Sequence, residues 1–180
     1  MEQHLVITTI GSDRPGISHH MITLVTQAGC NIIDSRIALF GSEFTLIMLV
    51  SGSTNAIAHV ETGLPLLGQQ HDLITMTKRT AQHTQPHNAY TMEVHVQADD
   101  KIGLTEKFTQ FFSMRNIGMS SLSAQTIDQS SVHQELRQFY IAISAQLNDD
   151  YNLMQLQEEF IELCDQSSVQ GSINFIKNSQ

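Results

Sequence analysis

The sequence predicts an α+β protein of two tandem units, each with an antiparallel sheet and the element order strand, helix, strand, strand, helix, strand. A length of 180 residues is enough for two small units, and 41% hydrophobic residues are enough for a core in each. A loop segment recurs 87 residues later, placing Gly103 opposite Gly16. Strand-like and helical patterns then follow in the same order after each copy.

In the first half, residues 5–10 read as a strand that leads into the repeated loop. The next segment has the apolar spacing of one buried helix face, at Ile17, Met21, Leu24, Val25 and Ala28. Gly29 is placed where a helix commonly ends on a left-handed residue. Alternation over residues 33–39 predicts a second strand, and Gly41-Ser42 predicts a turn.

Residues 44–50 are nearly all apolar, as expected of a central strand that is largely covered. Ile57, Val60 and Leu64 predict a second helix, which we expect Pro65 to end. Residues 72–77 then form the last strand of the first half.

The second half repeats this order. Strands are predicted at residues 91–96, 120–127, 139–145 and 171–176. Two helices are predicted from their apolar faces, the first from Leu104, Phe108, Phe111 and Phe112, the second from Leu153, Leu156, Phe160 and Leu163. Eight extra residues in or beside the polar stretch 128–135 predict a long, mobile second hairpin. Each half therefore follows the ferredoxin-like βαββαβ plan, with both helices on one face of the sheet. We expect domains at residues 1–80 and 90–180, joined by a linker at 81–89.

Composition argues against several classes of protein. The net charge is −9, and the nine Lys and Arg residues are scattered, which is unfavourable for direct binding to nucleic acid. No apolar stretch approaches the roughly 18 residues of a membrane helix, so no membrane association is expected. The first residues lack the pattern of a signal peptide, which predicts a cytoplasmic protein.

Neither cysteines nor histidines form a recognisable site. Cys30 and Cys164 are not part of a CxxC pair, and small buried thiols are the expected reading. The nine histidines include no HExxH pattern, so neither a metal site nor a cofactor is predicted. No catalytic constellation is suggested by neighbouring elements, and the protein is expected not to be an enzyme, although distant residues can assemble a site.

The loop at residues 11–17 is the sharpest local signal. Pro15 suits a first helical turn, and Ser12 or Asp13 can cap its amides. Gly16 lacks a β-carbon, so a ligand can approach closely. A helix N-terminus favours a carboxylate, but the local chemistry alone slightly favours a turn that caps the helix and binds nothing. The loop lacks both phosphate-binding glycine patterns.

The sequence resembles the ACT domain family, in which a strand is followed by the run Asp13-Arg14-Pro15-Gly16-Ile17 and an amphipathic helix. The helix leads into a segment similar to residues 29–32. The resemblance extends to residues 4–8, 29–36, 43–49 and 170–174, and within the family it is closest to tandem-domain repressors of transcription. It covers nearly the whole chain.

The resemblance implies amino-acid binding at a domain interface by the loop after the first strand and the segment that opens the second. The implied ligand-binding residues are Asp13, Arg14, Pro15, Gly16, Ile17, Asn31, Ile32 and Ile33. The corresponding second site comprises Asp100, Lys101, Gly103, Leu104 and Asn116. There Ile102 replaces the proline and Gly118 falls opposite Asn31, so this loop can instead serve only as an interface.

The function implied by the resemblance is repression of the glycine cleavage genes through binding of a DNA-binding activator, with glycine relieving the repression. A homodimer is expected because small open sheets leave faces and edges to be covered. An ACT-type sensor that regulates a separate metabolic enzyme is the alternative. A small enzyme and an interaction module without a ligand also stay open.

Overall fold

The computed structural model describes residues 2–81, 89–99, 102–131 and 134–178, with the backbone alone for 128–131 and 134–136. The chain divides into two compact units, Met1–Thr84 and Gln85–Gln180. Each has the order βαββαβ, which confirms the predicted α+β class with antiparallel ferredoxin-like sheets. The predicted linker, 81–89, lies largely outside the described residues.

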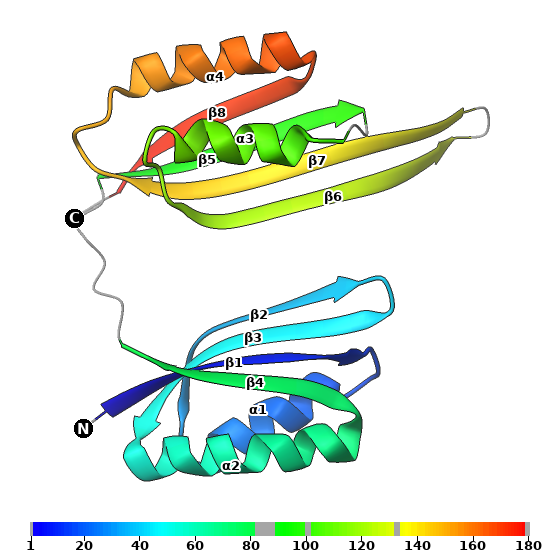
Figure 1. Cartoon of the computed structure of the whole chain (residues 1–180), viewed down its shortest axis with the longest axis vertical. Coiled ribbons are helices and arrows are strands. Elements are labelled where there is room, and N and C mark those ends of the chain that lie inside the picture. Colours follow the sequence, from blue (N-terminus) through cyan, green and yellow to red (C-terminus); the bar gives the residue numbers. More distant parts are fainter. Residues whose placement is uncertain (1, 82–88, 100–101, 132–133, 179–180) are drawn as a thin grey trace. The chain divides into compact units, whose positions relative to one another are not determined.

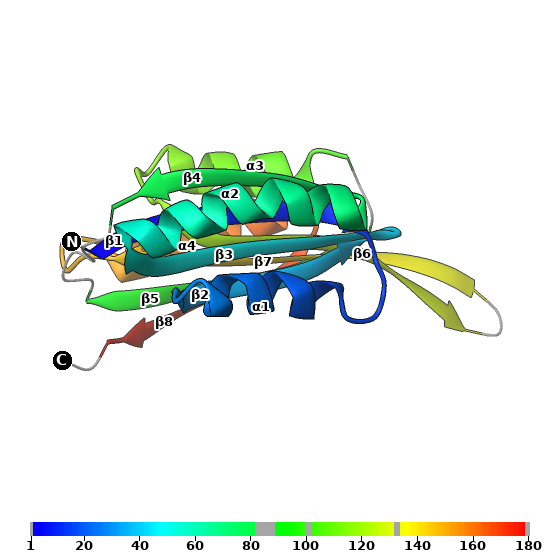
Figure 2. The same cartoon turned by 90° about the horizontal axis from the view of Figure 1, so that it is seen from below.

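The first unit comprises β1 (Glu2–Ser12), α1 (Ile17–Gln27), β2 (Asn31–Phe40), β3 (Glu43–Ser53), α2 (Thr54–His71) and β4 (Leu73–Thr80). Its strands pair in the order β2-β3-β1-β4, all antiparallel. Both helices lie on one face of the sheet, side by side (Figures 1 and 2). The other face, which carries no helix, is called the open face below.

The second unit comprises β5 (Tyr90–Asp99), α3 (Leu104–Ser113), β6 (Met119–Ser131), β7 (Gln134–Leu147), α4 (Leu153–Ser167) and β8 (Gln170–Lys177). The strand order β6-β7-β5-β8 repeats that of the first unit. Helices α3 and α4 likewise cover one face (Figure 1).

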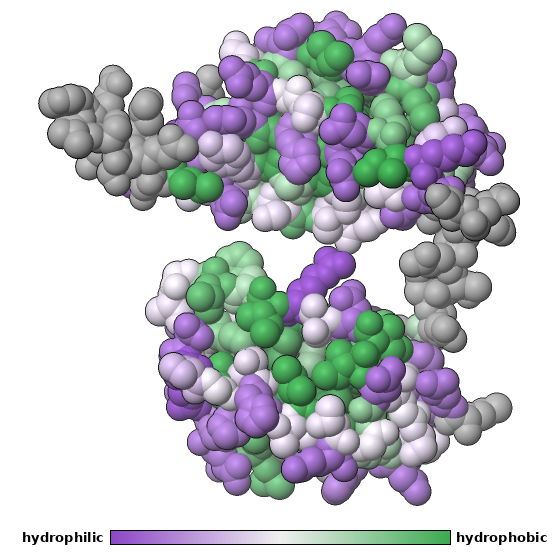
Figure 3. Space-filling model, turned by 180° about the vertical axis from the view of Figure 1, so that it is seen from behind, coloured by the Kyte–Doolittle hydropathy of each residue, from purple (hydrophilic) through white to green (hydrophobic). Residues whose placement is uncertain are grey.

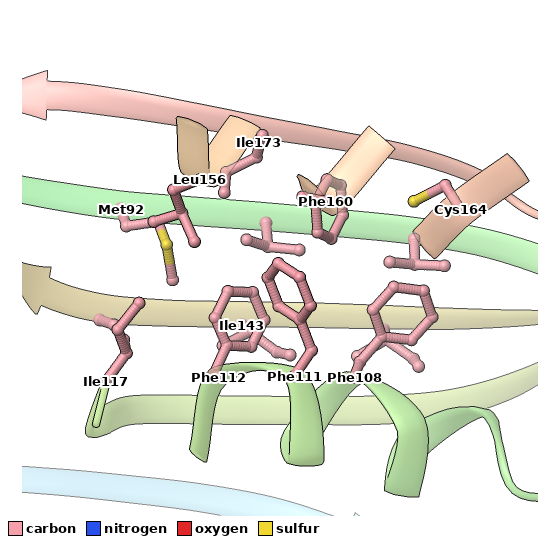
Figure 4. Packing of buried hydrophobic residues seen from close by; sticks show 14 of the residues in the cluster. Met92, Phe108, Phe111, Phe112, Ile117, Ile143, Leu156, Phe160, Cys164 and Ile173 are labelled. Carbon is pink, nitrogen blue, oxygen red and sulfur yellow. The ribbon is translucent and has the colours of Figure 1, made fainter. Parts of the chain in front are cut away.

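Each unit has its own core between helices and sheet, because alternate residues of the central strands face the helices. In the first unit, Leu5 and Ile7 of β1 and Leu46 and Met48 of β3 are fully buried against aliphatic side chains of both helices. The second core is instead aromatic. Phe108, Phe111, Phe112 and Phe160 surround one another with ring centroids 5.0 to 6.4 Å apart (Figure 4).

The second helix does not end at Pro65, as the sequence predicted. Helix α2 continues to His71 and ends at Asp72, which has a φ of 53°. An interior proline removes a single helical hydrogen bond. Leu64 and Gly68, on either side of Pro65, are buried against the sheet, and this packing holds the helix together beyond the break.

The long second hairpin is present. Strands β6 and β7 pair as far as Ser131 and Gln134, so part of the extra length extends the two strands. Its mobility stays a prediction.

Candidate functional site

The β1–α1 loop places Asp13, Arg14, Pro15 and Gly16 at the surface, ahead of the buried Ile17. Gly16 is the N-cap of α1 with φ 89° and ψ −6°, a left-handed conformation that glycine adopts without strain. The helix begins at Ile17, so Pro15 lies in the turn before it rather than in its first turn.

The first turn of α1 has no side-chain cap, and the expected capping by Ser12 or Asp13 is wrong. The reason is positional, because the residue at the N-cap is Gly16, which has no side chain to offer. The first turn also contains no acidic residue. The Ile17 amide donates to the Arg14 carbonyl at 3.3 Å, within the loop. The positive end of the helix dipole lies behind Gly16, a position that stabilises an anionic group.

The loop is fastened to the rest of the unit at two points. The Asp13 amide donates to the Ser42 carbonyl at 3.1 Å, which ties the loop to the β2–β3 hairpin. The Arg14 guanidinium donates to the carbonyl of His71, the last residue of α2. A cation at a helix C-terminus is favourable, so Arg14 also stabilises the end of α2.

His20 and His71 extend this contact. Their rings stack with centroids 4.5 Å apart and planes inclined by 19°. Burial lowers the pKa of His71, and the nearby His20 and Arg14 lower it further. This pair could not be predicted from the sequence, because its two residues lie 51 positions apart in the chain and no motif connects them.

The second predicted segment opens β2. Asn31 is exposed and pairs with Ser51, while Ile32 packs against the core. The pairing shifts between Ile32 and Asp34, so Ile33 lies in a bulge and is 48% exposed. A bulge re-aims side chains at a strand end, here beside the polar Asn31.

Within one unit, the loop and the start of β2 lie at opposite ends of the sheet. Asn31 pairs with Ser51, which pairs in turn with His4, whereas the loop follows Ser12. Eight residues of strand separate His4 from Ser12, or about 26 Å. A single unit therefore does not bring the two halves of the predicted site together.

The second unit reproduces only part of this arrangement. Gly103 is the N-cap of α3 with φ 90°, and Leu104 is buried. Asp100 and Lys101 lie outside the described residues. Glu106 sits in the first turn of α3, where its charge opposes an anionic ligand.

Asn116 is exposed at the surface, and its backbone makes the contacts that the structure shows. It follows α3 with a φ of 54°, as Gly29 follows α1 with a φ of 82°. Its carbonyl accepts a hydrogen bond from the Tyr151 hydroxyl at 3.2 Å.

A hollow that the sequence did not reveal lies on the open face of the second sheet, with a volume of about 520 Å³. Its polar lining consists of one histidine and hydroxyl or amide side chains: His95, Gln97, Ser123, Gln125, Tyr140, Gln170 and Ser172. Gln138 accepts hydrogen bonds from Gln97 at 2.7 Å and Tyr140 at 2.6 Å, which fixes one wall. None of the predicted site residues lines it.

Both cysteines are free and buried, as expected. Burial raises the pKa of both thiols, that of Cys164 to about 11, so neither is a reactive thiolate. In the described part of the chain, no three His, Cys, Asp or Glu side chains are grouped so that they could hold a metal ion. Nor does any helix among the described residues have the length and apolar character needed to span a membrane.

Comparison with known proteins is consistent with this architecture. A family profile described as an ACT domain matches residues 3–78. The glycine cleavage system transcriptional repressor of Escherichia coli (strain K12) is 38% identical over 179 residues, covering 99% of this chain and 93% of the relative.

The solved structures that cover nearly the whole chain include two with a TM-score above 0.7. One, provisionally assigned as a glycine cleavage system transcriptional repressor, is 65% identical, with a TM-score of 0.73 and 99% of both chains covered. An unknown protein from Galdieria sulphuraria shares the fold, at 19% identity and a TM-score of 0.75 over 98% of this chain and 99% of that one. The chain belongs to the ACT domain family, in the group that includes the glycine cleavage system transcriptional repressors.

Proposed function

We propose that this protein is an amino-acid-responsive regulator that represses the glycine cleavage genes indirectly, by binding a DNA-binding activator, and that glycine relieves the repression. The names of its full-length relatives support a role in regulating this system. A net charge of −9 supports a protein partner, because direct DNA binding depends on clustered cations that neutralise phosphates. We also propose that the protein acts in the cytoplasm.

The observation that carries the ligand-binding part is the uncapped N-terminus of α1 behind Gly16. The amides of the first turn beyond Ile17, together with the helix dipole, suit the carboxylate of an amino acid. Asn31 suits the ammonium group, since its side-chain carbonyl accepts hydrogen bonds while its amide donates. Asp13, exposed in the same loop, adds a negative charge for the ammonium group.

The separation of about 26 Å means that one unit does not hold both groups, and we propose that a second copy of the chain supplies the missing half. If two β2 edges lie antiparallel, the loop of one copy approaches the Asn31 end of the other. Two equivalent sites then form in a homodimer. The exposed apolar side chains Ile37 and Leu39 on β2 support contact at this edge.

Such a site links ligand binding to assembly. Glycine bound by residues from both copies stabilises the paired arrangement in which the two halves of the site meet. An activator that prefers the other arrangement is released when the paired one is filled. Small ligands with a carboxylate and an ammonium group fit best, because the site is built at the surface from backbone amides and one side-chain amide.

The test is calorimetric titration of the full chain with glycine, serine and alanine, using wild type, Asn31→Ala and the matched surface variant Asn174→Ala on β8. We expect saturable glycine binding in wild type and Asn174→Ala, and at least tenfold weaker binding in Asn31→Ala. Absence of glycine binding by the folded wild-type protein, or equal binding by Asn31→Ala, would overturn the proposed site.

A further inference from the structure

The hollow on the open face of the second sheet lies over two neighbouring rows of side chains. One row consists of four long side chains that are cross-strand neighbours, those of Gln125, Tyr140, Gln97 and Gln170. The next row consists of His95 and the short side chains of Ser123, Ala142 and Ser172. The long row therefore stands beside a low floor. The hollow encloses about 520 Å³, which is within the range of small-molecule sites.

The fold does not require this low floor. The counterpart of His95 in the first unit is Thr8, 87 residues earlier, and its cross-strand neighbours are Ile47 and Met76. Both of these side chains are bulky and more than half exposed, where the second sheet has an alanine and a serine. Hydrophobic side chains at the surface of the first unit are visible in Figure 3. The low, polar floor thus distinguishes the second unit from its duplicate.

The hollow combines a fixed wall with polar groups that are free to bind a ligand. Gln138 holds Gln97 and Tyr140 in place through two hydrogen bonds. In the described part of the chain, no residue forms a hydrogen bond with the side chain of Gln125 or Gln170. A carboxamide presents a donor and an acceptor side by side, which matches the adjacent donor and acceptor on the edge of adenine.

Tyr140 and His95 provide rings on which a base can stack. They lie on the two central strands, β7 and β5, and are diagonal neighbours about 7 to 8 Å apart. In RNA-binding domains, four-stranded sheets bind bases by stacking them on aromatic side chains of the sheet. Because every base has a ring face, stacking alone is tolerant, and the amide supplies the preference for one base.

The charges around the hollow exclude a phosphate group. Among the described residues, no lysine or arginine lines the hollow. Glu93 and Asp99 lie on the same face of β5, on either side of His95 and Gln97. The second unit has five Lys and Arg residues against twelve Asp and Glu residues, a net charge of −7. Since phosphates are bound by cations, these charges favour an uncharged ligand over a nucleotide or a nucleic-acid strand.

We propose that this hollow binds an uncharged purine nucleoside of the adenine type. The base stacks on Tyr140 and His95, and the amide of Gln170 pairs with its polar edge. The short side chains of the floor leave room for the ring. Such a ligand gives the second unit an input of its own, which shares no residue with the proposed glycine site in the first unit.

Equilibrium dialysis of the full chain with radiolabelled adenosine measures this binding, and we expect it to be saturable. Tyr140→Ala should weaken it by about tenfold or more, because the stacking ring is lost. Tyr140→Phe keeps the ring and should stay within about threefold of wild type. Gln170→Ala should weaken binding by about fivefold through the lost hydrogen bonds. Its matched control is Asn174→Ala, an exposed amide on the same face of β8 outside the hollow, which should bind as wild type does.

Adenosine monophosphate tests the charge of the ligand and should bind about tenfold more weakly than adenosine. Circular dichroism checks folding, and Gln170→Ala, at an exposed position, carries the test if Tyr140→Ala does not fold. Absence of saturable adenosine binding by the folded wild-type protein, or equal binding by Gln170→Ala, would overturn the proposal. Equal or tighter binding of the monophosphate would overturn the assignment of an uncharged ligand. Glycine titration of Gln170→Ala and adenosine dialysis of Asn31→Ala should both match wild type, so that a failure of one site is distinguished from a failure of the other.

Discussion

A few residues with unusual backbone angles define the β1–α1 loop and its counterpart in the second unit. Gly16 and Gly103 have φ values of 89° and 90°, and a β-carbon added at either would meet no atom within 4 Å. Glycine is needed at these positions for its conformation and not for lack of space. The open space beside Gly16 is also the space in which a ligand would lie.

Gly16→Ala should therefore lower the free energy of unfolding of the first unit by about 1 kcal/mol, the penalty for a β-carbon in a left-handed conformation. Gly118→Ala is the matched control, because Gly118 also has open space around it but no positive φ. It should be neutral or slightly stabilising. Urea unfolding followed by circular dichroism measures both, and equal effects would contradict the conformational explanation.

At the scale of elements, α2 shows how packing outweighs local preference. Pro65 interrupts the hydrogen-bond ladder, yet the helix runs for 18 residues from Thr54 to His71. At its far end, the carbonyl of His71 accepts a hydrogen bond from Arg14 of the β1–α1 loop. On its other side, Glu61 forms an ion pair with Arg79 of β4 at 2.7 Å, and this pairing lowers the pKa of Glu61.

Replacing Pro65 should stabilise the helix. Pro65→Ala restores the amide that can bond to the carbonyl of Glu61, and alanine has the higher helix propensity, so we expect a gain of about 1 kcal/mol. Leu66→Ala, at the neighbouring position that is 62% exposed, should change stability by less than about 0.5 kcal/mol. Thermal unfolding of wild type and the two variants measures these changes. A loss of stability in Pro65→Ala would show that the packing of α2 depends on the missing hydrogen bond at Pro65.

At the scale of the whole molecule, the chain contains two separate cores, one aliphatic and one aromatic. The three tyrosines, Tyr90, Tyr140 and Tyr151, all lie in the second unit, and the chain has no tryptophan. Tyrosine fluorescence therefore reports on the second unit, whereas far-ultraviolet circular dichroism reports on both.

Phe160→Ala should remove about 3 to 5 kcal/mol from the second unit, because its fully buried ring contacts three other phenylalanines. The unfolding transition seen by tyrosine fluorescence should move to a lower urea concentration. The transition of the first unit, seen by circular dichroism, should keep its urea midpoint. Ile161→Ala, at a position 47% exposed, is the control. A parallel shift of both transitions would show that the units unfold as one.

The sequence was sufficient for the fold because its signals are local. Apolar spacing identified every helix and strand, and the repeated loop identified the duplication. The end of α2 could not be predicted in this way, since buried Leu64 and Gly68 hold it through tertiary contacts.

The sequence predicted the separate parts of the candidate site but not how they are arranged in space. Motif similarity indicated the loop and Asn31, but their separation depends on the register of β1, β2 and β3, which is a non-local property. Contact between Arg14, His20 and His71 depends on how α1 and α2 meet, and no spacing in the sequence reports it.

The difference between the two cores has a consequence for folding. Units with the same strand order in one chain can exchange elements during folding, and tandem repeats are prone to this kind of misassembly. Helix α3 carries three phenylalanines into its core, whereas α1 carries Ile17, Met21 and Val25 into the other. An exchanged helix would overfill one core and leave voids in the other, and both errors destabilise. The aromatic cluster thus directs each helix to its own sheet, so that a duplicated plan folds into one arrangement.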